Sequence, residues 1–272
     1  MKKILTLAAL LLSSTPAFAQ TEAPAGPVTV SGSVALVSDY RFRGVSQSDK
    51  EMAVQGGLTV SHESGVYVGT WASNLAGWGT FGGSNMELDL FGGYAVPLGG
   101  ATLDVGLTWY MYPGGLDTTD FAEPYVKLSG DVGPASLLLG VAYAPKQRAL
   151  GNTDPAVHPA GRPGDKEDNL YIWGDASTAI PDTPLTLKAH LGYSDGNPGL
   201  GPNGTSIAPT GKYLDWMLGA DLAVGPVTLG VSYVDTDIGR SEAARLGGGF
   251  ASSKNGSSIS SGRVVFSVSA GF

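Results

Sequence analysis

The stretch that decides the fold is Arg263-Val-Val-Phe-Ser-Val-Ser-Ala-Gly-Phe272, the last ten residues of the sequence. Its apolar side chains share one parity, and the other parity is mostly polar. Successive side chains of a β-strand point to opposite faces, so this period of two predicts a strand with one apolar face. Such a strand fits either the half-buried last strand of a soluble sandwich or the wall of a transmembrane barrel. The apolar positions are Val264, Phe266, Val268, Ala270 and Phe272.

The other end of the sequence predicts export. Met1-Lys2-Lys3 precedes an apolar run over residues 4–12, and Ala17-Phe18-Ala19 follows. This order is typical of a secretory signal peptide, and the apolar run is too short to span a bilayer as a helix. We expect a signal peptide over residues 1–19, a tether over residues 20–27 and a mature protein that begins at Gln20.

Composition narrows the class of protein. Without Lys2 and Lys3 the balance is 14 basic minus 24 acidic residues, a net charge near −10, which argues against a nucleic-acid partner. The absence of cysteine excludes disulfides, cysteine metal sites and a lipid anchor on cysteine. Charged residues make up 15% of the chain, against about 25% in soluble domains. A surface that faces lipid explains this deficit.

Twelve segments of the chain alternate in the same way as the last ten residues. The connections between them also alternate, a longer polar one followed by a tight turn, throughout the sequence. Outer-membrane barrels have long outer loops and short periplasmic turns, whereas a sandwich has no reason to sort its loops. The predicted strands are residues 28–43, 52–61, 66–74, 85–96, 101–112, 120–130, 135–144, 168–180, 185–194, 213–224, 227–235 and 263–272.

We therefore predict an all-β fold, a transmembrane antiparallel up-and-down β-barrel of about twelve strands over residues 28–272. Hydrocarbon offers no water to an open sheet edge, so the segment 28–43 must pair with the segment 263–272. Phe266 and Phe272 are the residues that we expect to act in barrel closure.

The segment Ser38-Asp-Tyr-Arg-Phe-Arg-Gly-Val-Ser-Gln47 carries a family resemblance. Together with residues 54–58, 62–65, 67–74, 87–89 and 92–94, it resembles the proteobacterial Gcw_chp family, also called TorF-like porins. The match covers residues 38–94, and beyond them it rests on the alternation of predicted strands, loops and turns and on Phe272. The resemblance implies an outer-membrane protein of a Gram-negative bacterium, and it supplies no functional residues.

The terminal aromatic resembles the closing strand of bacterial outer-membrane barrels, where it is part of the signal read by the assembly machinery. The partners that we expect are outer-membrane lipid and lipopolysaccharide, the barrel-assembly machinery and small polar solutes.

Charged residues on the inner parity form the candidate site. Eight are acidic and five basic, with His190 counted as neutral. They line either a water-filled lumen that screens solutes or a narrow barrel plugged by ion pairs. Side chains fill a barrel of about eight strands, and a barrel of about 16 strands encloses an open channel. Twelve strands lie between these sizes, and we favour a narrow pore for passive diffusion of small polar solutes. The lumen-lining candidates are Asp39, Arg41, Arg43, Glu87, Asp89, Asp104, Glu123, Lys127, Asp175, Lys188, His190, Asp215, Asp221 and Arg263.

Arg41 and Arg43 form a basic patch near the outer end of the first predicted strand. The patch could contact anions, but buried charges are usually paired. We therefore expect these arginines to pair with Glu87 and Asp89.

Two further functions stay open. One is a non-conducting barrel whose long loops, residues 145–167, 195–212 and 236–262, bind a ligand or a surface. The other is a barrel lipid hydrolase. The mature histidines are His62, His158 and His190, and no Gly-x-Ser-x-Gly elbow accompanies them. A calcium-loop pattern at residues 235–239 lacks its final glutamate. We expect no catalytic residues, no cofactor and no metal.

Overall fold

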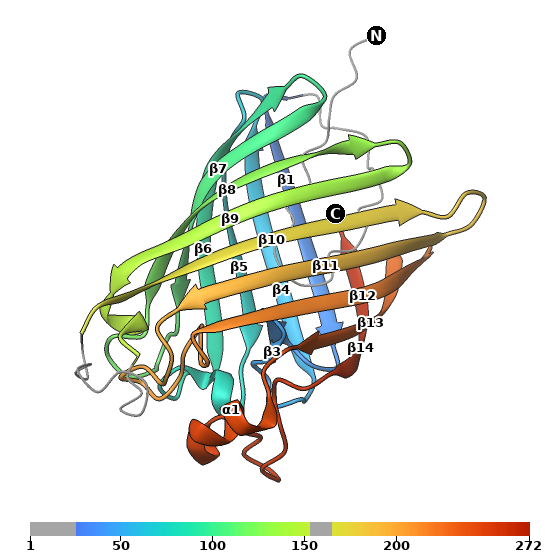
Figure 1. Cartoon of the computed structure of the whole chain (residues 1–272). Helices are drawn as coiled ribbons and strands as arrows, with labels where there is room; N and C mark the ends of the chain where they lie inside the picture. Colours follow the sequence, from blue (N-terminus) through green and yellow to red (C-terminus); the bar gives the residue numbers. More distant parts are fainter. Residues whose placement is uncertain (1–25, 153–164) are drawn as a thin grey trace.

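The structure, a computed structural model, describes residues 26–152 and 165–272. The predicted signal peptide, most of the tether and the middle of the loop 145–167 lie outside the described residues. Within the described part of the chain, twelve antiparallel strands close into one barrel, as the sequence predicted (Figure 1). No helix in this part is long and apolar enough to cross a membrane.

Each barrel strand pairs with the strands that precede and follow it along the chain, and β1 closes the circle by pairing with β14. The strands are β1 (Val28–Val37), β4 (Ala53–His62), β5 (Val66–Asn74), β6 (Met86–Leu98), β7 (Ala101–Met111), β8 (Phe121–Val132), β9 (Ala135–Gln147), β10 (Glu167–Ala179), β11 (Leu185–Gly196), β12 (Lys212–Val224), β13 (Val227–Thr236) and β14 (Arg263–Gly271).

The two faces of the wall differ as the alternation predicted. Val54, Leu139 and Leu218 are among many large apolar side chains exposed on the outer face. Polar and charged side chains of the same strands are buried inside, for example Asp104 on β7 and Glu123 on β8. An apolar exterior around a polar interior is the arrangement that a lipid bilayer requires.

The predicted pairing of the first and last strands is confirmed. Ser33–Val37 of β1 pairs antiparallel with Ser267–Gly271 of β14. Gly32 and Phe272 then exchange two backbone hydrogen bonds of 3.0 Å. A Cβ on Gly32 would lie 2.4 Å from the Phe272 ring, so glycine lets this ring cross β1 on the outer face. At the other end of the seam, the Ser38 N–H donates to the Phe266 carbonyl at 2.9 Å.

The first strand differs from its prediction. It ends at Val37 rather than at residue 43, and the chain then turns into the barrel. Residues 39–47, which we call the inward hairpin, contain β2 (Arg41–Phe42) and β3 (Val45–Ser46). Between them Arg43 and Gly44 have φ of 47° and 79°, the positive values of a two-residue type I′ turn. On the predicted strand 28–43, Tyr40 has the parity opposite to Asp39 and Arg41, that of the lipid face, yet it is buried inside.

Long connections gather at one end of the barrel and tight turns at the other (Figure 1). The long connections contain η1 (Gly77–Thr80), η2 (Arg148–Leu150), α1 (Arg240–Arg245) and η3 (Gly247–Gly249).

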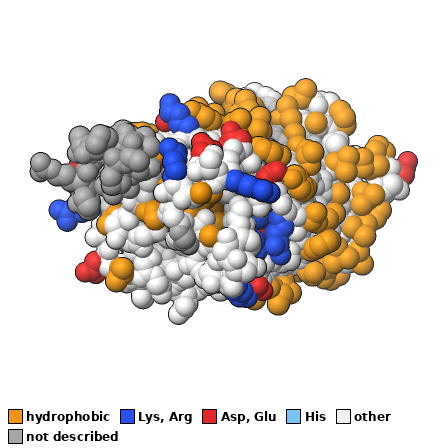
Figure 2. Space-filling model, turned by 60° about the horizontal axis from the view of Figure 1, so that its bottom comes forward, with side chains coloured by type: hydrophobic (Ala, Val, Ile, Leu, Met, Phe, Trp, Pro, Cys, Tyr) orange, Lys and Arg blue, Asp and Glu red, His pale blue; other side chains and the backbone are white. Residues whose placement is uncertain are grey.

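Connections that are distant in sequence pack on one another at this end, which we call the loop end. A small apolar core unites Val45, Trp78, Phe250 and Ile259, with the Trp78 and Phe250 rings 4.8 Å apart. Figure 2 looks onto the loop end, where loop atoms cover much of the view beside the apolar outer wall.

Candidate functional site

The inward hairpin is built first by local polar contacts at its base. Asp39 accepts a hydrogen bond of 2.9 Å from Arg41 Nε and another from the Ser46 hydroxyl. The Tyr40 N–H donates to the Ser48 hydroxyl at 2.9 Å. Arg41 Nη1 donates to the carbonyl of Gly44 at 2.8 Å. These contacts fold the segment onto itself, so that its tip points into the lumen.

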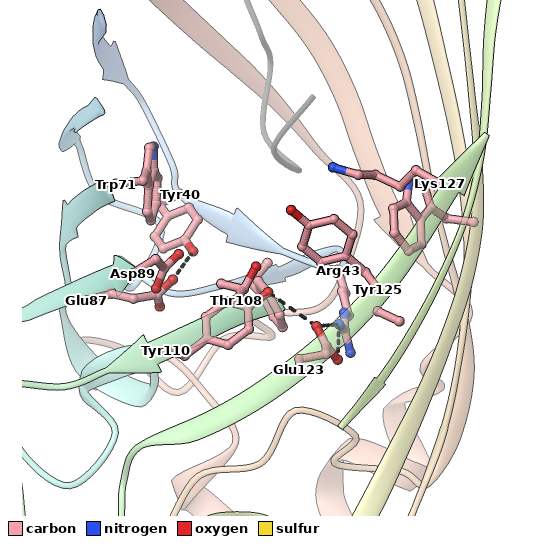
Figure 3. Close-up of a pocket in the computed structure, with 13 residues that line it drawn as sticks. Tyr40, Arg43, Trp71, Glu87, Asp89, Thr108, Tyr110, Glu123, Tyr125 and Lys127 are labelled. Carbon is pink, nitrogen blue, oxygen red and sulfur yellow. Dashed lines mark hydrogen bonds and ion pairs between the residues drawn. The ribbon is translucent and has the colours of Figure 1, made fainter. Parts of the chain in front are cut away.

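Arg43 at the tip reaches the opposite wall (Figure 3). Its Nη2 donates to both Glu123 oxygens at 2.7 Å, and its guanidinium lies 4.0 Å from the centre of the Tyr171 ring. Glu123 is on β8 and Tyr171 on β10, strands far from β1 around the barrel in either direction. Burial disfavours the Arg43 charge, but Glu123 outweighs it and raises the pKa of the guanidinium above its usual value.

The hairpin also contacts the near wall. The Tyr40 hydroxyl donates to Glu87 Oε1 on β6 at 2.8 Å, and the Tyr40 ring meets Trp71 of β5 at 5.4 Å (Figure 3). Burial and the Glu87 carboxylate raise the pKa of the Tyr40 hydroxyl well above its usual value, so it remains a donor. The ring of Phe42 packs edge-on against Tyr110 of β7 at 5.8 Å.

Gly44 brings the hairpin against a third part of the wall. A Cβ at this position would lie 2.3 Å from Thr236 Cγ2 and 3.0 Å from Asp215 Cβ. Its positive φ and this close approach both require glycine. The hairpin therefore spans the lumen, with contacts to β5, β6, β7, β8, β10, β12 and β13.

Other charged candidates pair between neighbouring strands of the wall. Lys127 Nζ lies 2.9 Å from Asp104, its direct cross-strand partner on β7, and Lys188 Nζ lies 2.8 Å from Asp221 of β12. The Tyr67 hydroxyl also donates to Asp104 at 2.7 Å. These contacts tie strand to strand and do not involve the hairpin.

His190 has carboxylates on both sides. Its Nδ1 lies 2.6 Å from Asp175, the cross-strand partner on β10, and its Nε2 lies 3.1 Å from Asp215 on β12. The Tyr171 hydroxyl is 2.9 Å from the same Nε2. Only the imidazolium form donates from both nitrogens, so this arrangement suits a charged histidine. The hydrogen-bond partners of His190 include no serine within the described residues.

The expected pairing of Arg41 and Arg43 with Glu87 and Asp89 is wrong. The hairpin turn carries Arg43 past β6 to Glu123, and Arg41 folds back to Asp39 at 2.9 Å. Arg263, at the loop-end rim, lies 3.8 Å from Asp39 and is partly exposed.

Glu87 and Asp89 instead line a cavity of about 60 Å³ between the hairpin and the wall. The rings of Tyr40, Trp71 and Tyr110 line the same cavity. Among residues 26–152 and 165–272, no group of three or more histidine or carboxylate side chains could hold a metal ion.

Aromatic residues complete the lumen, and the sequence reasoning missed them because it collected only charges. Tyr110, Tyr171 and Trp173 share the inner parity of their strands, so parity would have found them. Tyr40 had the outer parity, and no sequence signal placed it inside.

The fold and the polar lumen define a closed antiparallel β-barrel of the lipid-facing, transmembrane class. The chain matches the family described as Gcw_chp, bacterial protein of unknown function, over residues 21–272, and it belongs to this family. No curated protein matches the sequence.

Solved structures share the barrel at low sequence identity. A membrane protein studied for in-meso crystallization is 9% identical, with a TM-score of 0.50 over 89% of this chain and 83% of that chain. A porin is 10% identical, with a TM-score of 0.43 over 90% and 100% of the two chains. The COG4313 outer-membrane channel from Pseudomonas putida F1 is 10% identical, with a TM-score of 0.42 over 89% and 95%. These similarities concern the fold alone.

Proposed function

We propose that this protein is a non-enzymatic channel in the outer membrane of a Gram-negative bacterium, and that it admits small polar solutes. In the conformation described here the inward hairpin restricts the lumen. The observation that carries the proposal is the ion pair between Arg43 and Glu123, because it fixes the hairpin tip to the opposite wall.

Polar side chains and ion pairs line the inside of the barrel along the strands, which supports passage of polar solutes. Such a lining attracts and screens solutes by charge. The exposed apolar belt outside supports insertion in lipid.

The hairpin is held differently from the strands, which supports its role as the movable part. Its backbone joins the rest of the protein through single hydrogen bonds such as Ser46 N–H to the Ile259 carbonyl, 2.9 Å. Each strand of the wall shares a ladder with two neighbours. Displacement of the hairpin would therefore leave the barrel closed.

Conductance tests the proposal. Deletion of residues 39–47 should give a larger single-channel conductance in planar bilayers than the wild type has, because it clears the lumen. Deletion of residues 254–257, at an exposed loop tip, is the control and should leave conductance unchanged. Heat-modifiable migration in gels checks that each variant forms a barrel. A folded hairpin deletion that conducts no better than the wild type contradicts the proposal.

A non-conducting barrel that binds a ligand through its loops is the second candidate. The apolar core of Val45, Trp78, Phe250 and Ile259 favours it, since it gives the loop end a packed surface. The hydrolase alternative has less support, because His190 bonds to Tyr171 and two carboxylates rather than to a serine. Absence of current from both deletion variants favours the second candidate.

A further inference from the structure

Three carboxylates, Glu87, Asp89 and Glu123, and two basic side chains, Arg43 and Lys127, line the cavity between the hairpin and β6. Both basic side chains are already paired, Arg43 with Glu123 and Lys127 with Asp104. Six of the eight inner carboxylates lie within ion-pair distance of a basic side chain. Glu87 and Asp89 have no basic partner within residues 26–152 and 165–272. The six paired carboxylates are Asp39, Asp104, Glu123, Asp175, Asp215 and Asp221.

Both unpaired carboxylates are buried. The exposed fractions of Glu87 and Asp89 are 2% and 4%. Glu87 accepts hydrogen bonds from the hydroxyls of Tyr40 and Tyr112, but Asp89 Oδ1 is buried without any hydrogen-bond partner. Burial of an unpaired charge is costly, and such groups are normally paired or bind a cation. The two side chains line the same cavity (Figure 3), so one cation can serve both.

The walls of the cavity select the kind of cation. Tyr40, Trp71 and Tyr110 present aromatic rings, which attract weakly hydrated organic cations through their faces. Calcium prefers six to eight oxygen ligands, and magnesium a near-ideal octahedron of oxygens. Two carboxylates among aromatic rings are a poor match for either ion. The volume of about 60 Å³ limits the occupant to a few heavy atoms.

We propose that Glu87 and Asp89 form a binding site for a small organic ammonium ion in the lumen. Its N–H groups would donate to the two carboxylates, and its alkyl part would pack on the rings of Tyr40 and Trp71. The inference rests on the proposed channel function and deepens it, because it names small protonated amines as a class of solute that the lumen holds.

Calorimetry tests the site without requiring a current. Methylammonium chloride is titrated into the folded full-length barrel in detergent, at constant ionic strength maintained with sodium chloride. We expect saturable binding by the wild type. Glu87→Gln combined with Asp89→Asn should weaken it about tenfold or more, because charge-assisted hydrogen bonds become neutral ones. Tetraethylammonium, too large for the cavity, should give no saturable heat.

The matched control removes two carboxylates elsewhere. Asp131→Asn combined with Asp182→Asn makes the same change in net charge at exposed positions near the tight turns, and it should bind as the wild type does. Heat-modifiable migration verifies the fold of both double variants. Equal affinity in all three proteins overturns the site. Absence of saturable binding by the wild type overturns it too, and would mean that Glu87 and Asp89 share a proton instead of binding a cation. A hairpin deletion that conducts no better than the wild type, together with saturable methylammonium binding by the wild type, contradicts the channel and leaves the site standing.

Discussion

The inward hairpin and the barrel wall both contain buried ion pairs, yet the pairs join different parts of the molecule. Arg43 and Glu123 lie 80 residues apart and connect the tip of a hairpin to a strand across the lumen. Asp104 and Lys127 face each other on adjacent strands that are already joined by a backbone ladder. The first pair determines where the hairpin lies, while the second adds to a contact that exists without it.

This difference predicts separate effects on function and on stability. A pair between adjacent strands contributes to the free energy of unfolding of the barrel. A pair that holds the hairpin contributes mainly to the equilibrium between a docked and a released hairpin. Substitutions in the two places should therefore change different measurements.

The largest effect is expected from Arg43→Met. It leaves Glu123 buried without its cation, at a cost of about 3–5 kcal/mol. Release of the hairpin relieves this cost, because water then reaches Glu123. We expect a clear rise in single-channel conductance and faster proteolysis after Arg41.

The control for this prediction is Arg43→Met combined with Glu123→Gln, which also removes the unpaired charge of Glu123. The double variant should conduct less than Arg43→Met alone. If Arg43→Met raises conductance no more than the double variant does, the buried charge is not what releases the hairpin.

An intermediate effect is expected from Lys127→Met. Asp104 keeps the hydrogen bond from the Tyr67 hydroxyl, and 11% of its side chain is exposed against 3% for Glu123. The cost should therefore be smaller, about 1–3 kcal/mol. We expect a lower denaturation midpoint in urea and an unchanged conductance. A rise in conductance as large as that of Arg43→Met would remove the distinction between hairpin and wall.

The smallest effect is expected from Lys146→Ala. Lys146 lies 3.9 Å from Glu167 near the loop end, and its side chain is 63% exposed. Solvent screens such a pair, so stability should change by less than about 0.5 kcal/mol. Urea denaturation and conductance should both match the wild type, and a larger loss of stability would show that rim pairs behave like buried ones.

The wall was predictable from the sequence because its pattern is local. The period of two assigned Asp104, Glu123 and Lys127 to the inside, and the alternation of loops and turns set the order of the strands. Cross-strand pairs such as Asp104 with Lys127 follow once the register of two neighbours is known.

The hairpin was not predictable by the same reasoning. Alternation is interrupted only at Val37-Ser38 and resumes through residues 39–43, so the sequence looked like one continuous strand although β1 ends at Val37. Arg43-Gly44 is also a weaker turn signal than Asn-Gly, although its backbone has the same positive φ values. Contact between Arg43 and Glu123 depends on the width of the closed barrel, which no local pattern encodes.

The seam between β1 and β14 gives the hairpin a particular attachment. On one side β1 pairs along its whole length with β4, but on the other only Ser33–Val37 pairs with β14, with further bonds at Gly32 and Ser38. A short ladder opens at lower free energy than a long one, so amide hydrogen exchange should be fastest along this seam. The hairpin follows directly from β1 at the loop end. The strand at which the barrel opens most easily, β1, is therefore also the strand to which the lumen-blocking hairpin is attached.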